Sequence, residues 1–220
     1  EVPHTIIHHG IDTETFKPTS NKIALRKELN LPEGKLVGCF GRVRPQKGVD
    51  IFVEIMIKVC SQDPKAVGII CGQTTSDHKE FEAVLKSQVT DAGLSERIIF
   101  LGMQPSDRLP LLFAALDIYV APQRNEGFGL TPLEAMASGV PVIATTAGAF
   151  EEMVLNGETG YIVEIEDIVN MTKKLNELLS NDTKRRALAK ASIERVVQHF
   201  DIKGEAAALV RLYKDLLSKA

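Results

Sequence analysis

Short apolar runs recur along the chain and alternate with longer stretches in which apolar residues appear at helical spacing. Most of the runs lack polar alternation, so they predict parallel strands that are covered on both faces. The predicted strands are 4–8, 36–40, 66–71, 98–101, 117–120, 140–144 and 160–163. The predicted helices between them lie near 22–30, 48–60, 77–91, 106–115, 129–138 and 148–155.

The alternation of these elements predicts the fold class. Strands and helices that alternate through short connections are typical of an α/β fold with a Rossmann-like, doubly wound parallel sheet. From residue 166 onward the pattern is helical only, with breaks near 180–182 and at 200–201. We expect one domain over 1–200 and a C-terminal helix over 201–220 with an apolar stripe. The stripe comprises Ala206, Leu209, Leu212, Tyr213, Leu216 and Leu217.

Length and composition are those of one α/β unit. The 220 residues are 44% hydrophobic, enough for a sizeable core, and a formal net charge of −3 gives no global basic field for nucleic acid. No apolar run reaches the roughly eighteen residues that a membrane-spanning helix needs, so no transmembrane segment is predicted. The three cysteines are an odd number in mainly apolar surroundings, which favours a reducing compartment and hence the cytoplasm.

A loop in the second half of the chain carries the most informative chemistry. It brackets Gly127 and Gly129 with Glu126 and Glu134, and it runs into a predicted helix. Glycine has no Cβ, so its backbone can adopt positive φ and approach a ligand closely. Helix N-termini favour phosphate, and carboxylates accept hydrogen bonds from sugar hydroxyls. The loop therefore indicates a sugar-nucleotide pocket; the alternative is an ordinary strand-to-helix turn with two solvated glutamates.

Three ordered blocks of sequence extend this interpretation. Residues 126–142 contain the two glutamates and the following Ala-Met-Ala-Ser-Gly-Val-Pro-Val run, residues 41–48 read Gly-Arg-Val-Arg-Pro-Gln-Lys-Gly, and residues 6–18 end in Phe-Lys-Pro. Together they resemble the retaining glycosyltransferases of family 4, which have the two-domain GT-B fold. The first of these blocks in chain order usually reads Pro-Asn-Gly where this chain has His8-His9-Gly10, and paired histidines are more often structural than catalytic.

The resemblance assigns a role to each candidate residue. Arg42 and Lys47 follow the predicted strand at 36–40 and are expected to bind the diphosphate and to stabilise its charge as the glycosidic bond breaks. Two solvated loop cations are the alternative. Glu126 is expected to bind hydroxyls of the transferred sugar and completes the catalytic set. The predicted donor-binding residues are Gly41, Met103, Gln104, Gly127, Phe128, Gly129, Leu130, Thr131 and Glu134.

Within the donor-binding set the expected partners differ. Glu134 is expected to accept hydrogen bonds from the ribose hydroxyls, and Met103 and Gln104 belong to a loop that resembles the family's nucleobase site. Those two residues are equally well interpreted as packing residues. No cluster of metal ligands and no Asp-X-Asp motif appears, so neither a metal nor a cofactor is expected, and the nucleotide sugar is a substrate.

The implied function is retaining transfer of a sugar from a nucleotide diphosphate. The wording of the blocks resembles bacterial mannosyltransferases of lipopolysaccharide core assembly, which implies GDP-mannose as donor and a lipid-linked or other glycan acceptor at the cytoplasmic face of the inner membrane, with peripheral membrane association. UDP- and ADP-sugars remain alternatives. A sugar-nucleotide epimerase and a non-catalytic binding module are the rival functions. A glycosidase is disfavoured because a neutral glycoside offers the two cations no diphosphate.

The first residues of the chain resemble the exit of an interdomain linker. In the family, a preceding domain supplies the acceptor site, and the C-terminal helix crosses back to pack on it. We therefore expect an N-terminal acceptor-binding domain to be missing from this chain, the helix at 201–220 to face toward that domain, and the chain alone to bind donor while transferring little.

Overall fold

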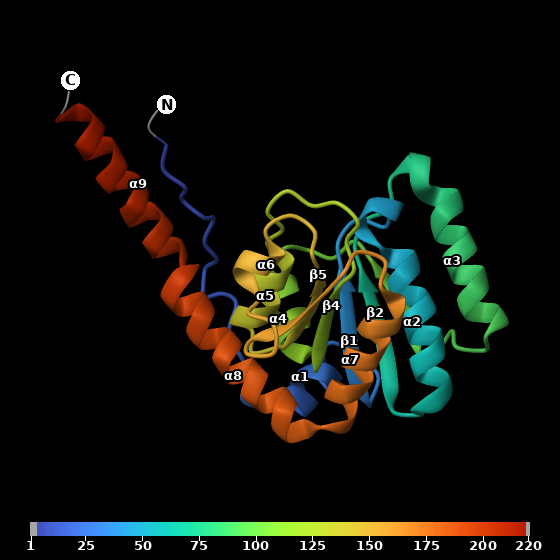
Figure 1. Cartoon of the computed structure of the whole chain (residues 1–220). Helices are drawn as coiled ribbons and strands as arrows, with labels where there is room; N and C mark the ends of the chain where they lie inside the picture. The colour runs from blue at the N-terminus through green and yellow to red at the C-terminus, as the bar shows by residue number, and fades with distance from the viewer. Residues whose placement is uncertain (1–3, 219–220) are drawn as a thin grey trace.

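In the computed structural model, which describes residues 4–218, six parallel strands form a single sheet (Figure 1). Their order across the sheet is that of a doubly wound Rossmann fold, so the predicted fold class is confirmed. The strands are β1 (Lys35–Phe40), β2 (Ala66–Cys71), β3 (Ile98–Gly102), β4 (Ile118–Ala121), β5 (Val142–Thr145) and β6 (Gly160–Val163). The order is β3-β2-β1-β4-β5-β6, and every neighbouring pair is parallel.

Helices cover both faces of this sheet and bury two apolar layers against it. One face carries α2 (Val49–Gln62), α3 (Lys79–Asp91) and α7 (Ile168–Ser180). The opposite face carries α1 (Lys22–Glu28), α4 (Leu109–Ala115), α5 (Thr131–Ala137) and α6 (Phe150–Met153), with α8 (Asp182–His199) against α5. Two short 3-10 turns, η1 (Pro45–Lys47) and η2 (Ser76–His78), precede α2 and α3.

The strand pattern reflects this double covering. All six residues of β2 are buried, and every residue of β4 and β5 is buried as well. Continuous apolar runs of this kind are what a parallel sheet with two covered faces requires. The predicted strands from 36–40 onward all form, with shifts of at most two residues at their ends.

The breaks in the helical tail have side-chain causes. The Asn181 side chain accepts a hydrogen bond from the Lys184 N–H and caps α8. The Asp201 side chain accepts from the Lys203 N–H in the same way and caps α9 (Ile202–Leu217). Short polar side chains at such positions satisfy N–H groups that a helix leaves free, so both predicted interruptions are confirmed.

The predicted strand at 4–8 is wrong. The segment from His4 to Gly10 joins no strand, and Ile6 is 75% exposed. The chain is instead held at Ile11, which forms an isolated parallel bridge with Asp201 at the start of α9. The two histidines that follow the apolar pair at positions 6 and 7 contact the rings of Phe128 and Phe200, which lie outside the sheet.

The last helix lies largely apart from the core. No residue of α9 is buried, and Figure 1 shows it extending beyond the layers of the domain. Tyr213, Leu216 and Leu217 of the predicted stripe are 59%, 57% and 78% exposed, whereas Leu209 and Leu212 are half-buried. The helix and its apolar stripe are therefore present, and its docking on another domain stays a prediction.

Candidate functional site

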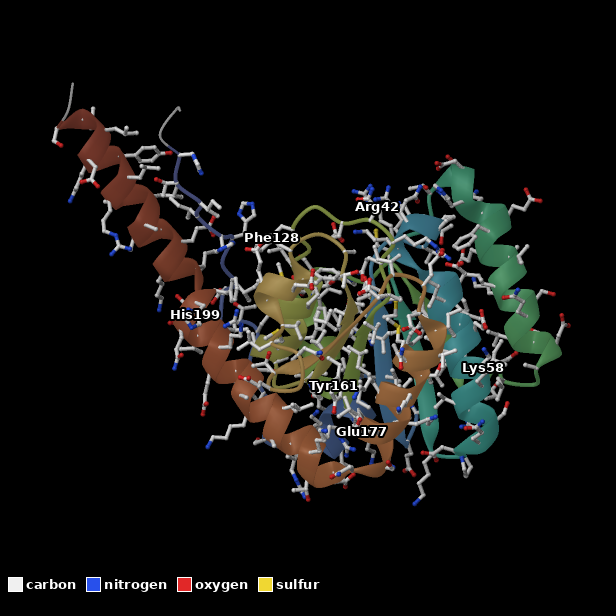
Figure 2. The ribbon with its side chains drawn as sticks, viewed as in Figure 1. Arg42, Lys58, Phe128, Tyr161, Glu177 and His199 are labelled. Atoms are coloured by element: carbon white, nitrogen blue, oxygen red, sulfur yellow. The ribbon has the colours of Figure 1, made fainter. Side chains whose placement is uncertain are left out.

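Two loops meet where the sheet changes its winding direction. β1 and β4 are neighbours, yet the helices that follow them, α2 and α5, lie on opposite faces. Open α/β sheets bind ligands in the crevice outside the strand ends at this point. The cation loop (residues 41–48) follows β1, and the glycine loop (residues 126–130) lies between β4 and α5. Figure 2 shows Arg42 and Phe128, one from each loop, at the same end of the molecule.

A pocket of about 220 Å³ opens outside the ends of β1, β2 and β3 and is bounded by α4 and α5. Arg42 and Glu134 are the charged residues in its lining, and Phe40 and Phe113 form an apolar wall with their ring centroids 4.7 Å apart. A pocket lined by charged side chains and by an aromatic wall suits a ligand that has both an ionic and a planar apolar part. The lining comprises Phe40, Gly41, Arg42, Cys71, Gly72, Met103, Gln104, Leu109, Phe113, Thr131 and Glu134, so six of the predicted site residues converge here.

Glu134 lies in the first turn of α5 with its side chain in this pocket. Burial raises the pKa of its carboxyl group to about 7, because a poorly hydrated site disfavours the charged form. The group is therefore part protonated at neutral pH. In its ionised form it accepts hydrogen bonds from two neighbouring hydroxyls, as the prediction of a ribose contact requires.

The remaining two catalytic candidates contact each other. Lys47 Nζ lies 2.5 Å from a carboxylate oxygen of Glu126, and the two side chains are 19% and 16% exposed. Ion pairs shielded from water are stronger than exposed ones, so each group neutralises the other in this structure. The loops that carry the predicted diphosphate and sugar contacts are thus joined by those same residues.

The glycine loop has one residue in left-handed geometry. Gly129 has φ of +83°, and a Cβ at that position would lie 2.5 Å from Phe150 and 2.8 Å from the Glu126 side chain. Only glycine fits there without displacing both neighbours. Gly127 has no positive φ, and a Cβ there would meet no neighbouring atom within 4 Å, so its glycine is not required by this conformation.

Arg124 is a structural contributor whose partners the sequence does not reveal. Its guanidinium makes two hydrogen bonds of 2.8 Å to the Asp50 carboxylate and one of 2.7 Å to the Pro45 carbonyl. A further bond of 2.6 Å reaches Glu166. The hydrogen bonds to Asp50 and the one to Glu166 raise the pKa of Arg124 above its ordinary value. Arg124 therefore fastens the segment before the glycine loop to the cation loop and to α2.

Tyr119 is a second such residue, hidden within the apolar run of β4. It is fully buried, and its hydroxyl donates a 3.0 Å hydrogen bond to the Phe40 carbonyl at the end of β1. Burial raises the pKa of the hydroxyl well above its usual range, so it stays a proton donor. This bond joins the two strands at the switch point, beside the pocket wall.

The predicted base loop follows β3. Met103 is 71% exposed at the pocket edge, while the Gln104 side-chain amide donates a 2.7 Å hydrogen bond to the Leu101 carbonyl. Since a carbonyl only accepts, the NH₂ end of Gln104 faces it and the amide oxygen is directed elsewhere. Neither residue is a core packing residue. Their contact with a nucleobase stays a prediction.

The described residues, 4–218, also bear on metal and thiol chemistry. No group of three or more histidine, cysteine or acidic side chains in this range is arranged to hold a metal ion. The thiols of Cys39, Cys60 and Cys71 are buried, and burial raises their pKa values to about 12, 11 and 11, so they are poor nucleophiles.

Over the described part of the chain, no helix combines the length and the apolar character that a bilayer span requires.

The fold and this crevice define a nucleotide-binding α/β domain of the kind that GT-B enzymes contain. Residues 21–195 match the family described as Glycosyl transferases group 1, and the chain belongs to this family. It is 44% identical to the lipopolysaccharide core biosynthesis mannosyltransferase LpsB of Rhizobium meliloti (strain 1021), over 99% of this chain and 62% of that protein. The chain thus spans less than two thirds of the length of this relative.

Solved structures show the same architecture. The C-terminal domain of the glycosyl transferase group 1 family protein LpcC from Francisella tularensis superposes with a TM-score of 0.84 at 36% identity, covering 88% of this chain and 100% of that one. Anabaena Alr3699/HepE in complex with UDP gives a TM-score of 0.88 at 26% identity, covering 96% and 57%. The family resemblance inferred from the three sequence blocks is therefore confirmed.

Proposed function

We propose that this chain is the donor-binding part of a retaining glycosyltransferase, that its donor is a nucleoside diphosphate sugar with GDP-mannose the best match, and that the acceptor is a lipopolysaccharide core or another glycan. The observation that carries the proposal is the convergence of Arg42, Gln104 and Glu134 on one pocket at the switch point of the sheet. The similarity to LpsB, a lipopolysaccharide core biosynthesis mannosyltransferase, supports the sugar and the acceptor class.

The parts of the ligand divide among the two loops and the pocket. The nucleobase lies against Gln104 and the aromatic wall, and the ribose hydroxyls donate to Glu134. The diphosphate lies between Arg42 and Lys47, whose charges oppose those of the phosphates. The sugar then reaches the glycine loop, where Glu126 accepts from its hydroxyls.

Donor binding replaces the Lys47–Glu126 ion pair with a contact of Lys47 to the diphosphate and a contact of Glu126 to the sugar. In this structure Lys47 and Glu126 satisfy each other at 2.5 Å. A diphosphate competes with Glu126 for the lysine, and the released carboxylate turns to the sugar hydroxyls. The diphosphate and the sugar are therefore bound together, and a nucleoside alone has no means of opening the pair.

Arg42 and Lys47 assist the bond-breaking step. Negative charge accumulates on the diphosphate as the sugar leaves, and fixed cations stabilise such charge without having to reorganise. The resemblance implies attack by the acceptor on the face that the phosphate leaves, with a phosphate oxygen accepting the acceptor's proton. The family chemistry thus needs no protein nucleophile.

Acceptor binding belongs, on this proposal, to a preceding domain, against which the exposed face of α9 packs. The length of LpsB beyond the match leaves room for such a domain. A lipid-linked acceptor implies a cytoplasmic enzyme that associates peripherally with the inner membrane.

Calorimetric titration with GDP, UDP, ADP, their mannosyl or glucosyl esters and the corresponding nucleosides tests the proposal. GDP and GDP-mannose are expected to bind most tightly, and mannosyl transfer is expected only after a preceding acceptor domain is fused or added. No preference for diphosphates over nucleosides would indicate a scaffold, and epimerised donor in the mixture would indicate the rival enzyme class. Robust transfer by residues 1–220 alone would require an acceptor site on this chain.

A further inference from the structure

The two adjacent histidines contact the glycine loop through one aromatic ring. The His8 ring stacks on Phe128 with centroids 6.1 Å apart and an interplanar angle of 26°. The His9 ring meets the same phenyl ring edge-on at 5.3 Å and 80°. Figure 2 labels Phe128 beside this N-terminal segment. One side chain of the glycine loop is therefore held by two rings from a segment far away in sequence.

Each histidine also contacts a second residue besides Phe128. His9 Nδ1 lies 3.1 Å from one oxygen of the Glu205 carboxylate, and the other oxygen accepts a 2.7 Å hydrogen bond from the Gly10 N–H. An ionised carboxylate only accepts, so Nδ1 carries the proton in this contact. His8 packs edge-on against Phe200, with centroids 5.8 Å apart. The segment is thus tied to Glu205 in α9 and to Phe200 at the end of α8.

Gly10 makes this attachment close. A Cβ at Gly10 would lie 2.5 Å from the Cα of Ile202, so only glycine lets the segment approach the first turn of α9 so nearly. The Ile11 N–H donates a 2.7 Å hydrogen bond to the Phe200 carbonyl, and the Ile202 N–H donates one of 3.0 Å to the Ile11 carbonyl. The backbone that follows the two histidines is therefore held closely against the start of α9.

The glycine loop has few backbone hydrogen bonds of its own. Among residues 4–218, the backbone N–H groups of Phe128 and Gly129 donate to no protein acceptor, and that of Gly127 donates to its neighbour Glu126. The loop backbone is therefore positioned by side chains, and Phe128 is the side chain that contacts the N-terminal segment. Loss of its two ring partners leaves the loop with more conformations to lose when a ligand binds.

We propose that His8 and His9 are positioning residues for the sugar end of the donor: they clamp Phe128 and thereby hold the glycine loop in its binding geometry. This role rests on the proposed function, because it assumes that the loop faces the sugar and the adjoining phosphate. The histidines themselves touch no part of the donor.

The test is calorimetric titration of the full chain with GDP-mannose and with GMP. His8→Ala/His9→Ala is expected to weaken GDP-mannose binding about three- to tenfold, the range for aromatic contacts of this kind. GMP binding is expected to change less than about twofold, because GMP does not reach the glycine loop. The single variant His8→Phe keeps an aromatic ring on Phe128. It is expected to bind GDP-mannose nearly as tightly as the wild-type chain. His199→Ala, an exposed histidine, is the matched control and is expected to change neither ligand.

A double-mutant cycle separates positioning from general stability. Phe128→Ala is expected to weaken GDP-mannose binding at least as much as His8→Ala/His9→Ala does, and the triple variant no more than Phe128→Ala, because the histidines act on the glycine loop through their ring contacts to Phe128. Additive losses, or equal losses for GMP and GDP-mannose, would overturn the positioning role. If the double variant unfolds, the single variants His8→Ala and His9→Ala carry the same comparison.

The wild-type titration distinguishes the two levels of the proposal. A wild-type chain that binds GDP-mannose while the histidine variants bind it equally well refutes the positioning role and leaves the proposed function standing. A wild-type chain that binds no nucleoside diphosphate sugar refutes both.

Discussion

The cation loop and the glycine loop face the same crevice but are built in different ways. The cation loop is anchored by its backbone: the N–H groups of Gly41 and Val43 donate to carbonyls at the end of β2 and just after it, at 2.8 and 3.0 Å. The N–H groups of Lys47 and Gly48 close the turn η1 at 3.0 Å. Over residues 126–130 of the glycine loop, no backbone N–H donates to a backbone carbonyl in the described structure. Side chains hold that loop instead.

The difference matches the parts of the ligand that each loop is proposed to bind. A diphosphate is the same in every nucleotide donor, and fixed cations stabilise its charge best when they do not reorganise. The sugar varies between donors, and a loop held by side chains can be adjusted by substitution without disturbing the sheet. The contrast predicts that changes in the cation loop affect all diphosphates alike, whereas changes around the glycine loop affect the sugar.

The largest expected effect is on the cations. Arg42→Ala and Lys47→Ala should each weaken GDP binding by about 1.5–3 kcal/mol, roughly ten- to 150-fold, because each removes a charge-assisted hydrogen bond. Guanosine binding should change much less. Arg186→Ala, at an exposed position on α8, is the control. Equal losses for GDP and guanosine, measured by calorimetry, would mean that these residues act through fold stability.

A smaller effect should separate the two glutamates. Glu134→Ala removes an acceptor for the ribose and should weaken GDP and GDP-mannose alike, by roughly 1–2 kcal/mol. Glu126→Ala should abolish the extra affinity that the sugar contributes. Because it also releases Lys47 from the 2.5 Å ion pair, GDP should bind as tightly as before or more tightly. Parallel losses on both ligands in both variants would contradict the division between ribose and sugar.

Binding should also depend on pH through Glu134. Burial raises the pKa of this carboxyl to about 7, so it is mainly protonated at pH 6 and mainly ionised at pH 8. If the ionised form accepts from the ribose, GDP-mannose affinity should rise up to about tenfold between these values. The folded protein holds this proton more tightly than the unfolded chain, so the contribution of Glu134 to stability falls as pH rises from 4.5 to about 7.

Glu134→Gln supplies the control for the pH series. A glutamine cannot ionise, so its affinity for GDP-mannose should be nearly constant from pH 6 to pH 8. GDP-mannose is preferable to GDP in this series because its diphosphate is esterified at both ends. A wild-type affinity that is flat, or that falls as pH rises, would show that the ribose does not require the ionised carboxyl.

The smallest expected effect is dynamic. Amide hydrogens of Phe128 and Gly129 lack backbone acceptors, so they should exchange faster than those of Gly41 and Val43 in the free protein. GDP-mannose should slow exchange in the glycine loop and change the cation loop little. Hydrogen-exchange mass spectrometry resolves the two segments, and equal initial protection of both would remove the contrast between them.

Much of the fold could be predicted from sequence because its parallel strands are buried on both faces. Runs such as Leu36–Phe40 and Ile118–Ala121 contain no charged residue, so they are readily interpreted as buried strands. Asn181 and Asp201 indicate where helices begin, because their short polar side chains can cap a helix N-terminus. The strand predicted at 4–8 failed for the opposite reason. An isolated apolar pair does not by itself show whether it joins a sheet, and Ile6 is 75% exposed.

The residues that join the site were beyond sequence reasoning. Arg124 binds Asp50, 74 positions away in the chain, and Tyr119 binds the carbonyl of Phe40, 79 positions away. Contacts of that kind follow from strand order, which a single sequence does not state. The same holds for the Lys47–Glu126 pair: both residues were predicted to bind donor, but their mutual contact depends on β1 and β4 being neighbours.

The most direct test of the account is a crystal structure of this chain with GDP-mannose. The predicted result is a diphosphate between Arg42 and Lys47, a ribose on Glu134, and a mannose beside the glycine loop, with Lys47 separated from Glu126. A donor bound elsewhere, or bound here with the Lys47–Glu126 pair intact and neither side chain in contact with it, would contradict the claim that the two loops converge on one ligand.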